Sequence, residues 1–366
     1  MILIIGVFSP MINWCGGAEW VAINVIRVLK EQGHRVIILT DKSLNQKKFA
    51  DVFNTKVSVD QQIVFPLALF PPPNYHNIYT DAIRSLLLKH KCEVLIDTYS
   101  NAILPGMDVS YIHYPLLKMV QTGLPYLRNK IYFYPYRRFL DFSKRDIDSK
   151  LFFANSRFTA EAVKVEFGVD SHILYPPVSN DILNHNETDL NQQRDNTVIT
   201  VGRISHEKNL ELIPHIARYT SKEVSFIIAG ILDSEEVLDS LLRLTRKLKV
   251  SGKVKILPNV RRDHLREILL NSKVYLHPMV NEHFGISIVE AMSSGCIPVV
   301  HDSGGVREFV PKHLRYRSIE EASQKVEKAI DDWSPIQARK VSKYADIFSE
   351  NNFSKRFIDI FNSYFR

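Results

Sequence analysis

Residues 281–305, NEHFGISIVEAMSSGCIPVVHDSGG, hold the pattern that decides the fold. A polar loop passes through Gly285 into an apolar segment with helical spacing at 286–294. A continuous apolar run at 296–301 follows and ends at an Asp-Ser-Gly-Gly turn. Helices that alternate with fully apolar strands are typical of a parallel sheet covered by helices on both faces.

The same alternation extends through the rest of the chain. Strands are expected at 2–8, 34–40, 92–97, 108–114, 150–156, 197–202, 224–230, 253–257 and 273–278. A polar, Asn- and Asp-rich segment at 176–196 interrupts the pattern and has linker composition. Because 366 residues exceed the usual size of one core, we expect an α/β protein with two doubly wound, Rossmann-like domains facing a cleft.

Composition narrows the class of protein. The chain is 45% hydrophobic and 24% charged, which is ordinary for a soluble globular protein. Its three cysteines are far apart, and its histidines show no close metal-ligand spacing, so neither disulfides nor a metal site are expected. No basic leader and no apolar run of membrane-spanning length occur. The net charge of +7 suits anionic partners.

Two glycine- or cation-bearing loops follow strands and precede helices. Gly16-Gly17 would let backbone N–H groups approach a phosphate at a helix N-terminus, although the pair also fits an ordinary helix-start turn. Arg203 and Lys208 would suit a diphosphate leaving group, although they also fit a solvated loop. Neither GxGxxG nor a P-loop is present, so a dinucleotide or ATP site is not indicated.

Glu282 and Glu290 lie on one loop and the helix that follows it. Their separation is roughly 12 Å if the segment is helical throughout. Paired glycosidase carboxylates instead converge from separate elements, about 5–10 Å apart. The two acids are therefore better placed to hold different parts of one long ligand, unless they are incidental acids on an amphipathic helix. His113 ends a strand beside two tyrosines, where it fits either a catalytic or a structural role.

The segment 126–145 interleaves aromatic and basic residues. This pattern is typical of contact with the headgroups of an anionic membrane. It also fits a helix packed on its own domain with its aromatic side chains inward. Stacking on nucleic-acid bases would suit it too, but no nucleic-acid motif accompanies it, so no such partner is expected. The candidate membrane residues are Tyr132, Phe133, Tyr136, Arg137 and Arg138.

Four motifs together resemble the retaining glycosyltransferases of family 4, which have the GT-B fold. They are CGGAE (15–19), SYIHYP (110–115), VGRISHEKNL (201–210) and the Glu-x7-Glu block with its Gly-rich turn (282–305). Within the family, the chain resembles the branch that transfers mannose from GDP-mannose to dolichol-linked oligosaccharide. The resemblance implies a hexosyltransferase of glycan biosynthesis with the same two-domain fold that the strand pattern predicts.

The resemblance also implies roles for the candidate residues of the second domain. Arg203 and Lys208 would hold the donor diphosphate, and Glu290 the ribose hydroxyls. Glu282 would hold the transferred sugar, together with the backbone of Phe284, Gly285 and Ile286. The cations and helix ends would stabilise the leaving diphosphate during transfer with retention, without a cofactor or divalent metal.

The first domain would bind the acceptor. The resemblance implies that this domain comprises residues 1–178 and 345–366, because the last helix of the GT-B fold crosses back to it. The nucleotide sugar would bind to the second domain, residues 179–344. His113 would contact the sugar, and Gly16-Gly17 would admit the phosphate and acceptor. The implied partners are a nucleotide sugar and a glycan or polyprenyl-linked acceptor, at the cytoplasmic face of a membrane.

Two other functions stay open at the level of sequence. A sugar-nucleotide epimerase would need an acid/base pair, for which His113 and Glu282 are the candidates. A basic module that binds membranes or nucleic acid would explain the charge but would leave the four motifs unexplained.

Overall fold

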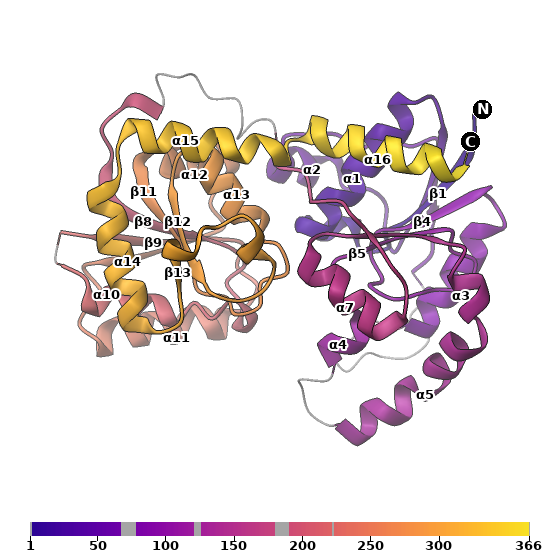
Figure 1. The fold of residues 1–366 in the computed structure, drawn as a ribbon, viewed down its shortest axis with the longest axis horizontal. Helices are drawn as coiled ribbons and strands as arrows, with labels where there is room; N and C mark the ends of the chain where they lie inside the picture. Colours follow the sequence, from indigo (N-terminus) through magenta and orange to yellow (C-terminus); the bar gives the residue numbers. More distant parts are fainter. Residues whose placement is uncertain (1, 67–77, 121–125, 180–189, 222, 366) are drawn as a thin grey trace. The chain divides into compact units, whose positions relative to one another are not determined.

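The computed structural model describes the whole chain except residues 1, 67–77, 121–125, 180–189, 222 and 366 (Figure 1). Two compact units emerge: Met1–Pro177 with Asn351–Arg366, and Val178–Glu350. The second unit extends past the expected end at 344. The reason is local packing, because Val178 N donates to the Phe348 carbonyl (2.8 Å) and the Phe348 ring lies against Phe284. Much of the expected linker, 180–189, lies outside the described residues.

The first unit is built on a parallel sheet of seven strands, in the order β3-β2-β1-β4-β5-β6-β7. These are β1 (Ile4–Phe8), β2 (Arg35–Thr40), β3 (Gln61–Val64), β4 (Val94–Asp97), β5 (Val109–Ile112), β6 (Leu151–Ala154) and β7 (His172–Ile173). Successive residues of β2 pack into different cores, since Val36 and Ile38 join one cluster while Ile37 and Leu39 join another. Both faces of the sheet are therefore covered, which explains why its strands are apolar throughout.

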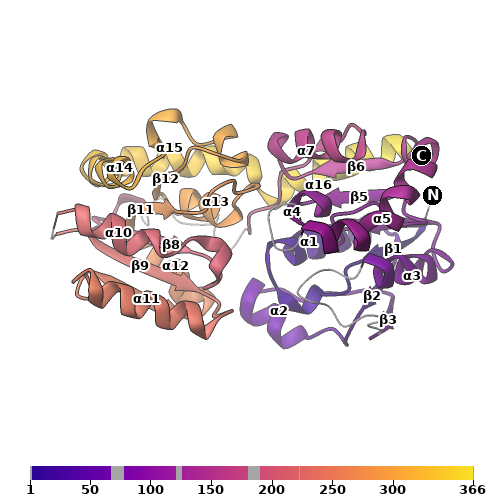
Figure 2. The same cartoon turned by 90° about the horizontal axis from the view of Figure 1, so that it is seen from below.

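Helices cover this sheet (Figure 2). They are α1 (Gly17–Glu31), α2 (Gln46–Phe53), α3 (Ile78–Lys89), α4 (Leu116–Val120), α5 (Tyr126–Phe142), α6 (Lys144–Ile147), α7 (Arg157–Phe167) and α16 (Glu350–Phe365). The last of these, α16, buries Phe353, Phe357 and Phe361 in the same core as α1 and β1. Spacing of four residues places the three rings on one face of the helix, so the C-terminal segment is part of the first unit.

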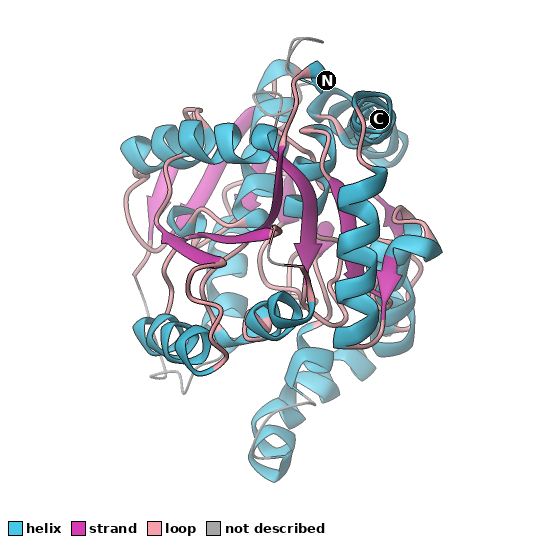
Figure 3. Ribbon diagram, turned by 90° about the vertical axis from the view of Figure 1, so that its left-hand side faces the viewer, coloured by secondary structure: helices cyan, strands magenta, loops and turns pink. Residues whose placement is uncertain are grey.

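The second unit contains a parallel sheet of six strands in the order β10-β9-β8-β11-β12-β13. Figure 3 shows the magenta strands of the protein with cyan helices around them. The strands are β8 (Asp195–Val201), β9 (Ser225–Gly230), β10 (Val254–Pro258), β11 (Ser272–His277), β12 (Ile297–His301) and β13 (Arg315–Tyr316). The helices are α10 (Leu212–Tyr219), α11 (Glu235–Lys247), α12 (Arg262–Asn271), α13 (Ile286–Ser293), α14 (Ile319–Asp332) and α15 (Pro335–Ala345). Among the described residues of this unit, 3-10 turns occur at His206–Lys208, Gly305–Glu308, Lys312–Leu314 and Asp346–Phe348.

In each sheet the strand order reverses beside the first strand of the unit. β1 lies between β2 and β4, and β8 lies between β9 and β11. Ligands of doubly wound sheets bind beyond the carboxyl ends of the strands at such a reversal. We therefore expect ligand contacts from the loops that follow β8 and β11 in one unit, and β1 and β4 in the other.

Candidate functional site

The loop after β8 carries the two expected cations, but the structure gives them different partners. Lys208 Nζ lies 3.1 Å from Glu282 Oε2, and both side chains are largely buried, at 21% and 11% exposed. Arg203 instead pairs with Glu207 and lies 3.8 Å from Asp233, with about half of its side chain exposed. Of the two cations, Lys208 is therefore the one that the structure brings to the Glu-x7-Glu segment.

Glu282 has a second partner that sequence reasoning missed. His277 Nε2 lies 3.0 Å from the same carboxylate oxygen, and the His277 side chain is 3% exposed. Burial acts to raise the pKa of Glu282, but the Lys208 charge and the hydrogen bond with His277 outweigh it and hold that pKa well below its usual value. Glu282 is thus a buried carboxylate that stays ionised. The signal for His277 was its position at the end of β11, where site residues of this fold gather.

The Gly-rich turn after β12 holds the backbone of the Glu282 loop. Gly305 N donates to the Glu282 carbonyl (2.8 Å), and Asn281 N donates to Ser303 Oγ (2.7 Å). Gly304 has φ +75°, and a Cβ there would overlap the Glu282 carbonyl oxygen. Only glycine combines this left-handed backbone with such a close approach. The Gly-rich turn therefore fixes where the Glu282 carboxylate lies.

The second carboxylate of the pair, Glu290, is also held by a cation. Arg262 Nη2 lies 2.9 Å from Glu290 Oε1, and both side chains are mostly buried. Arg262 begins α12, directly after β10, and was not among the expected residues. Its position beyond a strand end was the available signal. Glu282 and Glu290 therefore have separate cationic partners and do not share a proton with each other in an acid/base pair.

The N-terminus of α13 lies between the two acids in sequence. Gly285 caps the helix with φ +91°, a conformation that favours glycine. Ile286 begins the helix, and the first N–H groups of any helix lack acceptors within it. The Phe284 side chain is buried against Phe309 and Phe348, so only its backbone is suited to ligand contact.

In the first unit, the Gly16-Gly17 pair begins α1. Gly16 N donates to the buried Glu19 carboxylate (2.7 Å), so the chain's own acid already lies against this helix end. An arriving phosphate would meet that negative charge. The structure places the pair where the phosphate hypothesis needs it and at the same time supports the helix-start reading.

His113 follows β5 and is held on several sides. Its Nε2 atom lies 3.1 Å from the Thr98 carbonyl, which can only accept, so this nitrogen carries the proton. His113 N donates to Asn101 Oδ1 (2.7 Å), and Thr159 Oγ1 donates to the His113 carbonyl (3.1 Å). The imidazole is therefore oriented before any ligand arrives. Thr98, the partner of His113, follows Asp97, a carboxyl group whose pKa burial raises to about 6.

The structure does not support membrane contact by the aromatic residues that the sequence suggested on α5. Phe133 and Tyr136 on α5 are only 3% and 5% exposed and belong to the core beneath α3 and β4. Tyr136 OH accepts a hydrogen bond from Ile103 N (2.8 Å), and Tyr132 packs edge-on against Tyr79. These rings face inward and attach α5 to its own unit. This is the alternative given above, a helix packed on its own domain with its aromatic side chains inward.

A different set of α5 side chains is exposed. Ile131, Tyr134 and Phe142 are 70%, 62% and 79% exposed. Arg137 and Arg138, the two expected cations, are about half exposed, and the Arg138 guanidinium lies 5.1 Å from the Phe142 ring. No helix in the described part of the chain has the length and apolar character needed to cross a bilayer. Likewise, the described residues include no His/Cys/Asp/Glu group arranged to hold a metal ion.

This chain has two doubly wound parallel-sheet domains, which is the architecture of the GT-B class of proteins. Solved structures agree on this fold. A glycosyltransferase from Rickettsia africae ESF-5 superposes with a TM-score of 0.75 at 15% identity, covering 100% of this chain and 99% of that one. Anabaena Alr3699/HepE in complex with UDP and glucose gives 0.73 at 14% identity, covering 99% and 100%.

The family follows from sequence comparison. Residues 15–181 match the family described as Glycosyltransferase Family 4, and residues 182–348 match Glycosyl transferases group 1. The chain therefore consists of a Glycosyltransferase Family 4 domain followed by a Glycosyl transferases group 1 domain, which confirms the family that its four motifs predicted. This membership favours neither the epimerase nor the simple binding module.

Curated relatives carry two kinds of name. A GDP-Man:Man(3)GlcNAc(2)-PP-Dol alpha-1,2-mannosyltransferase of Dictyostelium discoideum is 28% identical over 237 residues, covering 57% of this chain and 46% of the relative. The human protein of that name is 25% identical, covering 83% and 73%. A phosphatidylinositol N-acetylglucosaminyltransferase GPI3 subunit of Saccharomyces cerevisiae is 24% identical, covering 92% and 81%. The match to the Dictyostelium protein thus spans about half of that relative's length.

Proposed function

We propose that this chain is a retaining hexosyltransferase that moves mannose from GDP-mannose onto a glycan or polyprenyl-linked acceptor. The observation that carries the proposal is the contact of Lys208 with the buried, ionised Glu282 beyond the ends of β8 and β11. A cation and a carboxylate placed together there suit a ligand that has both a diphosphate and sugar hydroxyls. The mannosyltransferase relatives support the choice of sugar.

The donor would be held along the second unit. Lys208 donates to the diphosphate from one side, while Glu282 accepts from hydroxyls of the sugar. Backbone N–H groups from Phe284 to Ile286 supply further donors at the start of α13. Glu290, oriented by Arg262, accepts from the two ribose hydroxyls. Arg203 joins the diphosphate by exchanging its exposed partner Glu207.

The transfer itself breaks the bond between the anomeric carbon and the diphosphate oxygen. The acceptor oxygen forms its new bond on the same face of the sugar and passes its proton to the departing phosphate. The enzyme's part is electrostatic, because Lys208, Arg203 and the helix N-terminus stabilise the charge that grows on the leaving group. His113 contacts the sugar, and Gly16-Gly17 admit the phosphate and acceptor.

These cations supply the charge for which other transferases use a metal ion, so we propose that no divalent metal or other cofactor is required. Activity measured in EDTA and in added Mg²⁺ tests this point. Equal rates are expected. A rate that collapses in EDTA and returns with Mg²⁺ would replace the cation mechanism with a metal-assisted one.

The identity of the sugar is tested by donor binding followed by product analysis. A thermal-shift panel of GDP-, UDP- and ADP-sugars should show the largest rise in melting temperature with GDP-mannose, since ligands of the folded state raise its stability. Transfer to a lipid-linked glycan should then give an α-linked product. A second candidate function is transfer of N-acetylglucosamine, which the name of the GPI3 relative motivates. A preference for UDP-N-acetylglucosamine would favour it. No transfer from any donor by folded protein would refute the proposal.

We further propose that the protein acts at the cytoplasmic face of a membrane through α5. The exposed side chains Ile131, Tyr134 and Phe142, flanked by Arg137 and Arg138, are what supports this surface. Apolar side chains would enter the headgroup layer while the guanidinium groups meet anionic lipid. A polyprenyl-linked acceptor would be found in the same layer.

A further inference from the structure

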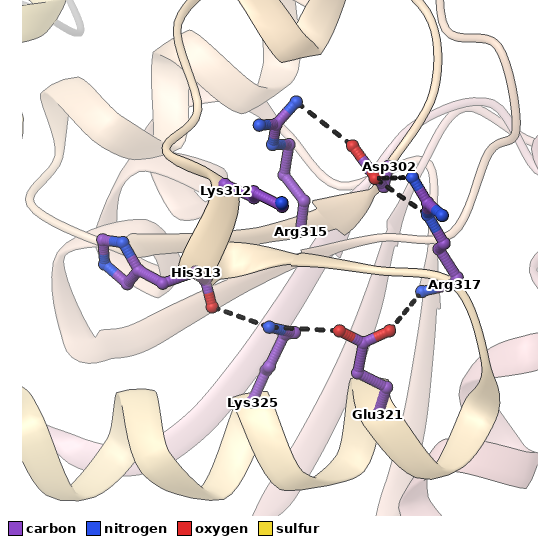
Figure 4. A pocket seen from close by; sticks show the side chains of 7 residues that line it. All are labelled: Asp302, Lys312, His313, Arg315, Arg317, Glu321 and Lys325. Carbon is purple, nitrogen blue, oxygen red and sulfur yellow. Dashed lines mark hydrogen bonds and ion pairs between the residues drawn. The ribbon is translucent and has the colours of Figure 1, made fainter.

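A charged pocket of about 690 Å³ lies at the β13 edge of the second sheet. Its lining comes from the end of β12, the 3-10 turn before β13, β13 itself and α14 (Figure 4). Lys208 and Glu282, by contrast, follow β8 and β11. The pocket is therefore distinct from the proposed donor site, and none of its lining residues belongs to the four sequence motifs except Asp302.

Every lining residue carries an ionisable side chain. Four are cationic: Lys312, Arg315, Arg317 and Lys325. Two carboxylates oppose them, Asp302 and Glu321. Because cationic side chains outnumber the carboxylates in the lining, the pocket suits a small polyanion.

The two carboxylates are already held by cations. Asp302 lies 2.7 Å from Arg317 Nη2 and 3.1 Å from Arg315 Nη1, and these partners, with Arg307, hold its pKa below the usual value against the raising effect of burial. Glu321 pairs with Lys325 (3.2 Å) and accepts from Arg317 N (2.8 Å). Figure 4 shows these contacts as dashed lines, and through them the two carboxylates orient the cations around the pocket.

Two donors remain for a ligand. Across the described parts of the chain, the Lys312 ammonium has no ion-pair or hydrogen-bond partner. The Nε atom of Arg315 is buried and has no hydrogen-bond partner there either. Lys312 is exposed, so its ammonium is free to contact a ligand at the pocket mouth. The unpartnered donor of the buried Arg315 guanidinium is costly, and such a group is normally satisfied by a ligand, ion or water.

We propose that this pocket is a second anion site that binds a phosphorylated compound, one that presents a phosphate or diphosphate group to Lys312 and Arg315. The volume accommodates more than a single phosphate. A soluble phosphorylated metabolite and a phospholipid headgroup share this chemistry. The inference does not rest on the proposed transferase reaction, because it uses none of the donor-site residues.

Inorganic pyrophosphate is the first probe, with binding measured by calorimetry on the full chain. Lys312→Gln should weaken binding at this site about tenfold, and Lys312→Glu should abolish it, because a charge-assisted hydrogen bond is lost and then replaced by repulsion. Lys312 is exposed, so both variants should fold normally. Lys328→Glu is the matched control, since this exposed lysine lies on α14 outside the pocket.

Pyrophosphate also suits the proposed donor site, so binding is measured in Lys208→Gln as well. The binding event that Lys312→Glu removes should persist in Lys208→Gln. Vesicles of phosphatidylcholine with phosphatidic acid form the second arm. Loss of vesicle binding in Lys312→Glu assigns the site to lipid headgroups, and loss of pyrophosphate binding alone assigns it to soluble phosphates. If neither probe responds to Lys312→Glu more than to Lys328→Glu, the anion site does not exist.

Discussion

His277 Nε2 lies 3.0 Å from Glu282 Oε2, so a buried imidazole and the Lys208 ammonium converge on one carboxylate oxygen. Replacing His277 with Phe should raise the pKa of Glu282, because a hydrogen bond to the charged form is lost while burial remains. Activity should then fall at acidic pH, where Glu282 becomes protonated, and return as pH rises. The measurement is kcat and KM against pH. A profile identical to that of the unmodified enzyme would show that His277 does not position Glu282.

Lys208→Gln should cost roughly 1–3 kcal/mol in the free energy of unfolding at neutral pH, because it leaves the Glu282 carboxylate with less compensation. The lowered pKa of Glu282 means that its ionised form stabilises the fold above the unfolded-state pKa, and this contribution is lost as pH falls through the folded-state value. Transfer should slow by about 10²–10³-fold. Urea unfolding of Lys208→Gln is compared with that of the double variant Lys208→Gln/Glu282→Gln, in which removal of the uncompensated charge should restore part of the free energy of unfolding. If the second substitution restores no stability, the charge argument is wrong.

Glu290→Ala should weaken nucleotide-sugar binding more than it slows the reaction of bound donor, since a ribose contact is made equally in ground and transition states. Arg262→Gln should act in the same direction but less strongly, because Arg262 orients Glu290 from 2.9 Å. Donor titrations and single-turnover rates separate the two effects. A large loss of single-turnover rate with unchanged affinity would overturn the ribose role.

Gly304→Ala should destabilise the second unit by roughly 1–3 kcal/mol and reduce transfer, because the methyl group collides with the Glu282 carbonyl at a left-handed backbone position. Gly252→Ala is the matched control: a Cβ there meets no atom within 4 Å, and its backbone is not left-handed. Thermal melts and transfer rates of both variants are compared. Equal behaviour would show that the Gly-rich turn does not hold the Glu282 loop.

Ile131→Ser/Tyr134→Ser should reduce sedimentation with anionic vesicles, because both side chains are exposed on α5 and available to the headgroup layer. Arg137→Ala/Arg138→Ala should also reduce it, with an effect that disappears at high salt. Tyr219→Ser, a change at an exposed tyrosine of the second unit, is the control. Vesicle binding that is unchanged in both double variants would remove α5 as a membrane surface.

The fold was largely predictable because strand and helix periods are local properties of a sequence. Each expected strand is present, and the cations and acids follow strand ends as predicted. β3, β7 and β13 were missed because they are short and carry polar residues, as edge strands do. Polar edge strands resemble loops in any pattern based on hydrophobicity alone.

Pairing within the candidate site depended on contacts that no local pattern encodes. Lys208 and Glu282 are 74 positions apart, and Arg262 and Glu290 are 28 apart. Sequence placed Arg203 and Lys208 together, whereas the structure joins only Lys208 to Glu282 and leaves Arg203 with Glu207. It also turned Phe133 and Tyr136 inward, because burial of an aromatic ring is decided by what packs against its helix.

By itself, the sequence determined the fold class, the family and the loops in which site residues lie, because these follow from period, spacing and motif. The tertiary structure alone decided which charges meet. His277, Arg262 and the Lys312 pocket became visible only when the parallel strands brought distant loops to shared edges of one sheet. Partner choice between charges depends on distance and burial, and both are properties of the folded chain.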